Sequence, residues 1–211
     1  MGGLIGRKVG MTSVFDEVGN NIPCTLVEVT PNVVTQVKSA DGADGYDAVQ
    51  LAAVERKAGR VTRARRGHFE RAGTSPRQKL VEFRRDFAGQ EVSLGDEITV
   101  DDVFEEGDIV DVVGISKGKG FQGVVRRHGF KGVGSRTHGQ HNRERAPGSI
   151  GASSDPSRVF PGMKMAGRQG NARTTVQNLE VVQVLGEQHV LLLKGAVPGP
   201  RGGFVTIHKK K

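Results

Sequence analysis

The chain has 211 residues, of which 36% are hydrophobic, and a formal net charge of +8, which is material for one or two domains with a modest core. Its single cysteine, Cys24, lies among apolar residues and is predicted to be buried, which excludes a disulfide framework and a thiol-rich metal site. Because no apolar run is long enough to span a membrane and the N-terminus lacks the apolar region of a signal peptide, we expect a cytoplasmic protein with no membrane contact.

The N-terminal part of the chain predicts a meander of short strands. Gly19-Asn20 and residues 41–45 supply turns, because glycine and asparagine tolerate positive φ angles. Pro31-Asn32 separates two strands directly, so that these two are predicted to form a hairpin. The predicted strands cover residues 3–9, 22–30, 33–38 and 47–53, and those at 22–30 and 33–38 are rich in β-branched residues in alternation.

Residues 55–79 differ from the strands before them. They are basic, contain Gly59, Gly67 and Gly73, and lack the alternation of strands, which predicts an irregular or short-helical insertion. Together with the strand predicted at 80–85, they carry eleven Lys or Arg against three acids. A basic surface of this kind favours a polyanion, and we expect Arg63, Arg65 and Arg66 to contact RNA.

The next stretch, 86–115, has ten acids and no Lys or Arg. It is predicted to present an acidic surface, facing either solvent or a basic neighbour. Two segments within it, 95–100 and 107–115, begin with Gly-Asp and then alternate, which predicts a pair of barrel strands, each entered by a turn.

Three more strands are predicted at 176–185, 189–194 and 204–209, with turns at 186–189 and 198–203. The sum is a mainly β fold, with roughly eight to ten short strands closing into a barrel. The predicted organisation has a β-barrel body, a basic insertion and an extended loop: residues 1–54, 80–115 and 174–211 form the body, 55–79 the insertion and 116–173 the loop.

The loop 116–173 is the most unusual stretch of the chain. It holds twelve Lys or Arg, two acids and twelve glycines, but only ten Val, Ile, Leu, Met or Phe. So few apolar residues cannot offset the ordering entropy of a packed core, and the loop is therefore predicted to order on a large polyanion. Arginine suits phosphate, whereas aromatic residues for base stacking are sparse, which favours folded RNA. The candidate RNA contacts in the loop are Lys117, Lys119, Arg126, Arg127, Lys131, Arg136, His138, His141, Arg143, Arg145, Arg158, Lys164, Arg168 and Arg173.

Two features of the sequence suggest functions other than RNA binding. Gly118–Gly123 matches the G-x-G-x-x-G pattern of nucleotide-binding enzymes, but no amphipathic helix or β-α-β unit is predicted around it. His128, His138 and His141 suggest a metal, yet no cysteine completes the ligand set. We therefore expect no cofactor, no metal, no small-molecule substrate and no enzymatic activity. Two alternatives remain. The protein is a free RNA chaperone, or its runs of charged residues are simply solvated surfaces.

Several motifs resemble ribosomal protein L-three, the third protein of the large ribosomal subunit, in its bacterial form. They are MGGLIGRKVGMT at 1–12, SKGKGFQG at 116–123, PGSIG at 147–151, KMAG at 164–167 and NLEVV at 178–182. The resemblance covers essentially the whole chain. It implies a translation-protein-like β-barrel and a structural role in the large subunit, with binding to large-subunit (23S) rRNA near its 3′ end and nucleation of early assembly. It also implies neighbouring ribosomal proteins as partners, the fourteenth and nineteenth among them.

The same resemblance implies that the loop runs towards the peptidyl transferase centre. The bacterial family carries a glutamine-rich tip that is methylated on a glutamine, whereas Ser154 occupies that position here, so this modification is expected to be absent. Asp155 places a carboxylate where rRNA is expected to be close. The expected tip residues near the centre are Pro147, Gly148, Ser149, Gly151, Ala152, Ser153, Ser154 and Asp155.

Overall fold

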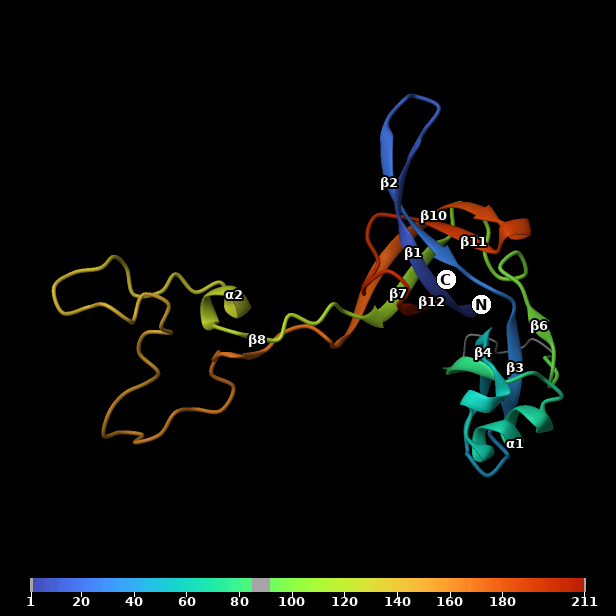
Figure 1. Ribbon diagram of the computed structural model, residues 1–211, viewed down its shortest axis with the longest axis horizontal. Helices are drawn as coiled ribbons and strands as arrows, with labels where there is room; N and C mark the ends of the chain where they lie inside the picture. The colour runs from blue at the N-terminus through green and yellow to red at the C-terminus, as the bar shows by residue number, and fades with distance from the viewer. Residues whose placement is uncertain (1, 85–91, 211) are drawn as a thin grey trace. The chain divides into compact units, whose positions relative to one another are not determined.

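The computed structural model describes residues 2–84 and 92–210, and it is mainly β, which confirms the predicted fold class. The chain divides into two compact units, whose elements are labelled in Figure 1. One unit, which we call the body, comprises the chain up to Ser116 and again from Arg173 onward. The other, which we call the loop unit, is Lys117–Ala172.

Six antiparallel strands of the body close into a barrel, in the order β1-β12-β7-β10-β11-β2. Side chains alternate across each strand, so that one set faces the barrel interior. Leu4, Val27, Leu191 and Ile207 are among those with no exposed surface, and Cys24 is buried as predicted. The strands are β1 Gly3–Phe15, β2 Asn21–Glu28, β7 Ile109–Ile115, β10 Arg173–Leu185, β11 Val190–Lys194 and β12 Phe204–Lys209.

A second sheet of the body has the strand order β5-β4-β3-β6. The predicted hairpin around Pro31-Asn32 is therefore wrong: β2 belongs to the barrel, where it pairs with β1 and β11, whereas β3 pairs with β4 and β6. The strands of this sheet are β3 Asn32–Lys38, β4 Ala48–Glu55, β5 Arg77–Arg84 and β6 Glu97–Ile98.

Asn32 provides the physical reason for this crossing between sheets. Its side chain is fully buried. Its Oδ1 accepts a hydrogen bond from the Ile5 N–H at 3.0 Å, and its Nδ2 donates to the carbonyls of Ile5 at 3.1 Å and Thr30 at 2.8 Å. These bonds satisfy backbone groups that would otherwise be buried without partners. Pro31-Asn32 thus marks the passage from the barrel to the second sheet.

The predicted pairing of segments 95–100 and 107–115 is also wrong. β6 pairs with β3 in the second sheet, whereas β7 lies in the barrel between β10 and β12. Three turns closed by aspartates interrupt the region: Asp96, Asp102 and Asp108 accept hydrogen bonds from backbone N–H groups three residues earlier, at 2.7–2.8 Å. The barrel has six strands rather than the eight to ten predicted, because four strands of the body form the second sheet instead.

The same turns account for part of the acidic stretch 86–115. Hydrogen bonds from the Thr99 hydroxyl and N–H hold the pKa of Asp102 below its ordinary value. Asp108 pairs with Lys209 at 2.6 Å, and Glu97 lies 3.6 Å from Arg77. Several acids thus serve the body's own turns and ion pairs. Residues 86–91 of this stretch lie outside the described residues, and its basic neighbour stays a prediction.

The basic insertion contains a 3-10 turn, η1 Ala58–Arg60, and the helix α1 Arg63–Arg71. Phe69 is fully buried beneath the helix. His68 Nε2 donates to Gln50 Oε1 of β4 at 2.7 Å, and the Thr35 hydroxyl of β3 donates to the same oxygen at 3.0 Å. These contacts attach one face of α1 to the second sheet.

A polar network stabilises the same sheet. Lys38 Nζ donates to the Tyr46 hydroxyl at 3.0 Å and lies 2.9 Å from the Glu82 carboxylate, to which Tyr46 also donates. The hydrogen bonds to Tyr46 and Glu82 raise the pKa of Lys38, and the hydrogen bond from Lys38 lowers the pKa of Glu82. The Arg84 guanidinium lies 3.9 Å from the centre of the Tyr46 ring, a cation–π contact.

Candidate nucleic-acid interface

The loop unit begins and ends at neighbouring barrel strands. Ile115, at the end of β7, pairs with Arg173, at the start of β10. Within the loop unit, β8 Phe121–Gln122 pairs with β9 Gly167–Arg168. The Lys119 N–H donates to the Gln169 carbonyl at 2.9 Å, and the Gln169 N–H donates to the Gly120 carbonyl at 3.0 Å. A short antiparallel ladder thus joins the two arms near the base of the loop unit.

A short helix, α2 Val124–His128, follows this ladder and ends at Gly129, whose φ is 72°. No helix was predicted at these residues. Arg127 Nη1 donates to the Met165 carbonyl at 2.7 Å, and His128 Nε2 donates to the same oxygen at 3.1 Å. Arg127 therefore joins α2 to the returning arm, and its charge has a role within the loop unit itself.

A second internal contact lies farther along the loop unit. Arg136 forms an ion pair with Glu144, and the Val133 N–H donates to the Glu144 carbonyl at 3.1 Å. Gly132 has a φ of 86°, and a Cβ there would overlap that carbonyl oxygen, so the close approach requires glycine. Glu144 is one of the two acids of the loop, and Arg136 balances its charge.

Apart from these contacts, the loop unit is strongly exposed. Of its residues 117–172, all of which are described, only Val124 is buried. Exposed apolar side chains accompany the cations: Phe121 is 74% exposed and Phe160 is 55% exposed, with the Arg158 guanidinium 5.5 Å from the Phe160 ring centre. A segment this poor in buried surface has little core of its own.

The predicted contact residues of the loop therefore fall into two groups. Arg127 and Arg136 have partners within the loop unit. The others are exposed and make no side-chain hydrogen bond or ion pair with the described residues; they are Lys117, Lys119, Arg126, Lys131, His138, His141, Arg143, Arg145, Arg158, Lys164, Arg168 and Arg173.

The predicted tip, Pro147–Asp155, is exposed throughout. Gly148 has a φ of 88°, and the Ser149 hydroxyl lies 3.3 Å from the Gly151 carbonyl oxygen, to which it donates. Asp155 is exposed and has no ion pair among the described residues. The tip thus presents polar and backbone groups outward.

The three predicted arginines of the basic insertion lie on α1 or at its start. Arg65 donates to the Gln78 carbonyl at 3.2 Å, and Arg66 donates to the Ala58 carbonyl at 3.2 Å. Arg63 makes no such contact with the described residues. Arg71, which was not among the predicted contacts, lies about two turns beyond Arg63 on the same helix and is also exposed.

The Gly118–Gly123 segment does not lie in the fold of a nucleotide-binding loop. Gly118–Gly123 is followed by a helix of five residues, and its strand β8 pairs antiparallel with β9, which is not the β-α-β unit that holds a nucleotide. The described residues contain no group of three His, Cys, Asp or Glu placed to hold a metal ion. Among them there is also no helix long and apolar enough to cross a membrane.

Comparison with known proteins adds independent information. A model of the family described as ribosomal protein L3 matches residues 49–190. The large ribosomal subunit protein uL3 of Salinibacter ruber (strain DSM 13855 / M31) is 61% identical over 208 residues, which cover 99% of this chain and 99% of that protein. The resemblance predicted from the sequence motifs is thereby confirmed.

Proposed function

Because the chain belongs to the ribosomal protein L3 family, whose members are structural constituents of the large subunit of the cytoplasmic ribosome, we propose that it binds large-subunit (23S) rRNA mainly through the loop unit. The family is one of structural proteins, and we propose no catalytic role for this chain. Its partners in this role are rRNA and other proteins of the subunit.

The observation that carries the proposal is the surplus of unpaired cations in the loop. Of the twelve Lys and Arg in residues 116–173, two have polar partners within the loop unit, and the side chains of the other ten make no hydrogen bond or ion pair with the described residues. Ten exposed cations on a segment with a single buried residue repel one another. RNA phosphates would neutralise them and release condensed counterions, which favours binding.

The glycines and arginines support backbone recognition in particular. Glycine allows close approach of a nucleic-acid backbone, and arginine donates two parallel hydrogen bonds to one phosphate. Such contacts fix position on a folded RNA without selecting a base sequence. We therefore propose that the loop unit recognises the shape of its rRNA site.

Family membership supports the finer proposals. We propose that the rRNA site lies near the 3′ end, that binding there nucleates early subunit assembly, and that the tip Pro147–Asp155 lies towards the peptidyl transferase centre. The fourteenth and nineteenth proteins of the subunit are the proposed protein neighbours. Ser154 cannot accept a glutamine methyl group, so mass spectrometry of the tip peptide from assembled subunits should show no methylation there.

A deletion tests this function. Replacing residues 136–158 by a short glycine linker removes the tip but retains β8, β9 and the contact of Arg127 with Met165. We expect the circular dichroism of the body to be unchanged and the incorporation into large subunits, measured by co-sedimentation at high salt, to fall sharply. The matched control is a full-length variant in which Arg143, Arg145 and Arg158 are replaced by Gln, which separates loss of charge from loss of length. Undiminished incorporation of the deletion variant, or an unfolded body, would contradict the proposal.

A further inference from the structure

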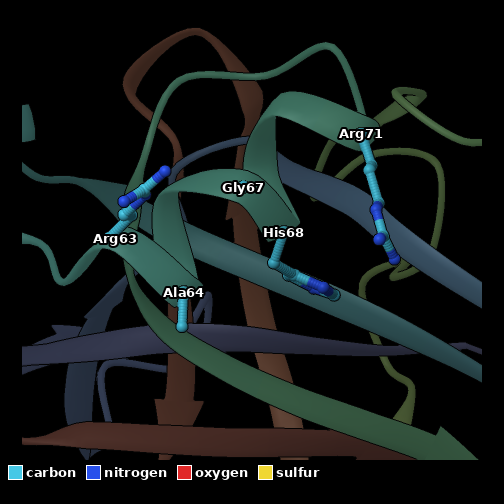
Figure 2. Close-up of a pocket in the computed structure, with 5 residues that line it drawn as sticks. All are labelled: Arg63, Ala64, Gly67, His68 and Arg71. Carbon is cyan, nitrogen blue, oxygen red and sulfur yellow. The ribbon is translucent and has the colours of Figure 1, made fainter.

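One face of α1 is hollowed. The hollow has a volume of about 580 Å³ and is lined by Arg63, Ala64, Gly67, His68 and Arg71. Figure 2 shows Arg63 and Arg71 towards opposite ends of the helix, with Gly67 between them. A smaller hollow of about 190 Å³ adjoins it, sharing His68 and Arg71 and lined also by Leu94 and part of β3. All of these residues belong to the body.

Gly67 has no evident structural purpose within the chain. It lies in the middle of α1, where glycine weakens a helix relative to alanine. A Cβ at this position would meet no atom within 4 Å among the described residues, and its φ is not in the left-handed region. Gly132 differs, because its φ and its contact both require glycine. The bare backbone at Gly67 is therefore available to a molecule outside the chain.

The arginines of α1 fall into two groups, those that bond to the body and those that do not. Arg65 and Arg66 donate to backbone carbonyls of the body. Arg63 and Arg71 line the hollow, are exposed, and have no side-chain hydrogen bond or ion pair among the described residues. They follow one row with Gly67 at i, i+4 and i+8, and are about 12 Å apart along the axis at ~1.5 Å per residue. The helix thus holds one free cation on each side of its bare patch.

We propose that this hollow is a second RNA site, separate from the loop unit, in which a phosphodiester backbone crosses α1 at Gly67 and its phosphates bind Arg63 and Arg71. The inference rests on the proposed function, because it specifies where the body contacts the rRNA. The sequence composition alone does not distinguish Arg71 from the other basic residues of the insertion. His68 also lines the hollow, and a hydrogen bond of 2.7 Å to Gln50 fixes its position.

An RNA backbone fits this arrangement better than an acidic peptide. In RNA the backbone itself carries the negative charge. When its phosphates bind the two arginines, the backbone therefore comes close to the helix surface between them. A residue without a side chain at Gly67 leaves room for this approach. The carboxylates of an acidic peptide project from its backbone on side chains, which reach arginines without requiring a glycine between them.

The test uses the full-length chain and deproteinised 23S rRNA, with affinity measured by filter binding over a range of salt concentrations. The double variant Arg63→Ala/Arg71→Ala should make the slope of log affinity against log salt shallower by about 1.4–1.8, at ~0.7–0.9 per phosphate contact. The matched control, Lys57→Ala/Arg60→Ala, removes two exposed cations of the same insertion that do not line the hollow, and should leave the slope nearly unchanged.

Gly67→Ala gives a sharper test, because stability and binding should change in opposite directions. Alanine favours the helix and should raise the melting temperature by roughly 2 °C, whereas its methyl group should weaken rRNA binding several-fold without changing the salt slope. Gly59→Ala is the control, since a Cβ there also meets open space and Gly59 lies outside the hollow. Hydroxyl-radical footprinting should show protected nucleotides that the hollow variants lose and the controls keep.

The outcomes separate this inference from the proposed function. If the unaltered chain binds rRNA with steep salt dependence but the hollow variants match their controls, the second site is wrong and the loop proposal stands. If the unaltered chain shows no salt-dependent binding, both fail. Variants that lose binding to polyglutamate, while their rRNA affinity matches the controls, would assign the hollow to an acidic protein and overturn the RNA site.

Discussion

Two adjacent arginines in α2 allow a direct test of the division between structural and RNA-binding cations. Arg126 is exposed and has no partner among the described residues, whereas Arg127 donates to the Met165 carbonyl at 2.7 Å. Both lie in the same helix and carry the same charge. We expect Arg126→Ala to weaken rRNA binding without altering the loop unit, and Arg127→Ala to loosen the loop unit itself.

The structure sets the size of each effect. Arg127 makes one hydrogen bond in an exposed setting, for which a net contribution of about 0.5–1.5 kcal/mol is typical, equivalent to a factor of about 2 to 13 in a local opening equilibrium. His128 keeps its own bond to the same carbonyl, which favours the lower part of that range. Removing Arg126 should instead make the salt slope of rRNA binding shallower by ~0.7–0.9.

Hydrogen exchange of the full-length chain, followed by mass spectrometry, provides the assay. Peptides that contain α2 and β9 should exchange about 2 to 13 times faster in Arg127→Ala, and at the unaltered rate in Arg126→Ala. Peptides from the barrel should be the same in both. If the two variants exchange identically and change the salt slope equally, then Arg127 is an ordinary phosphate contact and the division is wrong.

Three further predictions concern the loop turn, the junction between the sheets and the polar network. Gly132→Ala should speed exchange around Glu144, because its Cβ would overlap that carbonyl oxygen, while the melting temperature of the body stays the same; a slower or equal rate would contradict the close approach. Asn32→Ala should lower the free energy of unfolding in urea by roughly 2–5 kcal/mol, since it leaves two buried backbone groups of Ile5 and the half-buried Thr30 carbonyl without their partner; a loss below the error of the fit would refute this role. The pKa of Glu82 is held below its ordinary value of 4.5, so its pairing stabilises the fold above about pH 4.5 and is lost as the pH falls through the lowered value. Lys38→Met should therefore reduce the acid dependence of stability between those pH values, and an unchanged dependence would argue against the pair.

The sequence predicted the β character of the body because strand patterns are local. The strands predicted at 107–115 and 189–194 correspond to β7 and β11, and the strand predicted at 3–9 is the first part of β1, which extends to Phe15. The assignment of strands to two sheets was not predicted. It depends on the long-range hydrogen bonds of Asn32 to Ile5. The dipeptide Pro31-Asn32 is compatible both with a hairpin turn and with a crossing between sheets, so the local sequence does not distinguish them.

The candidate site was predictable in composition but not in detail. Charge and glycine content identified the loop, since both are properties of the sequence. The roles of Arg127 and Arg136 depend on acceptors that the fold brings to them; the Met165 carbonyl lies 38 residues from Arg127. The helix α2 was missed because five residues are too few for a periodic pattern. Gly129 after Arg126-Arg127-His128 was the available indication of its C-terminal end.

The hollow on α1 illustrates the same limit. Arg63, Arg65 and Arg66 were selected from the basic composition of the insertion, yet two of them donate to carbonyls of the body. Arg71 was not selected, because nothing in the sequence distinguishes it from its basic neighbours. Only the helix geometry places it in one row with Arg63 and Gly67.

The central claim is that the unpaired cations of the loop bind rRNA phosphates, and the salt dependence of 23S rRNA binding tests it most directly. Ten such cations contribute at most about −7 to −9 to the slope of log affinity against log salt, at ~0.7–0.9 per contact. Replacing Arg143, Arg145, Arg158 and Lys164 by Gln should make the slope shallower by about 2.8–3.6, whereas Arg136→Gln, whose charge Glu144 already balances, should change it little. A slope near zero for the unaltered chain, or the same slope in the fourfold variant, would contradict the account.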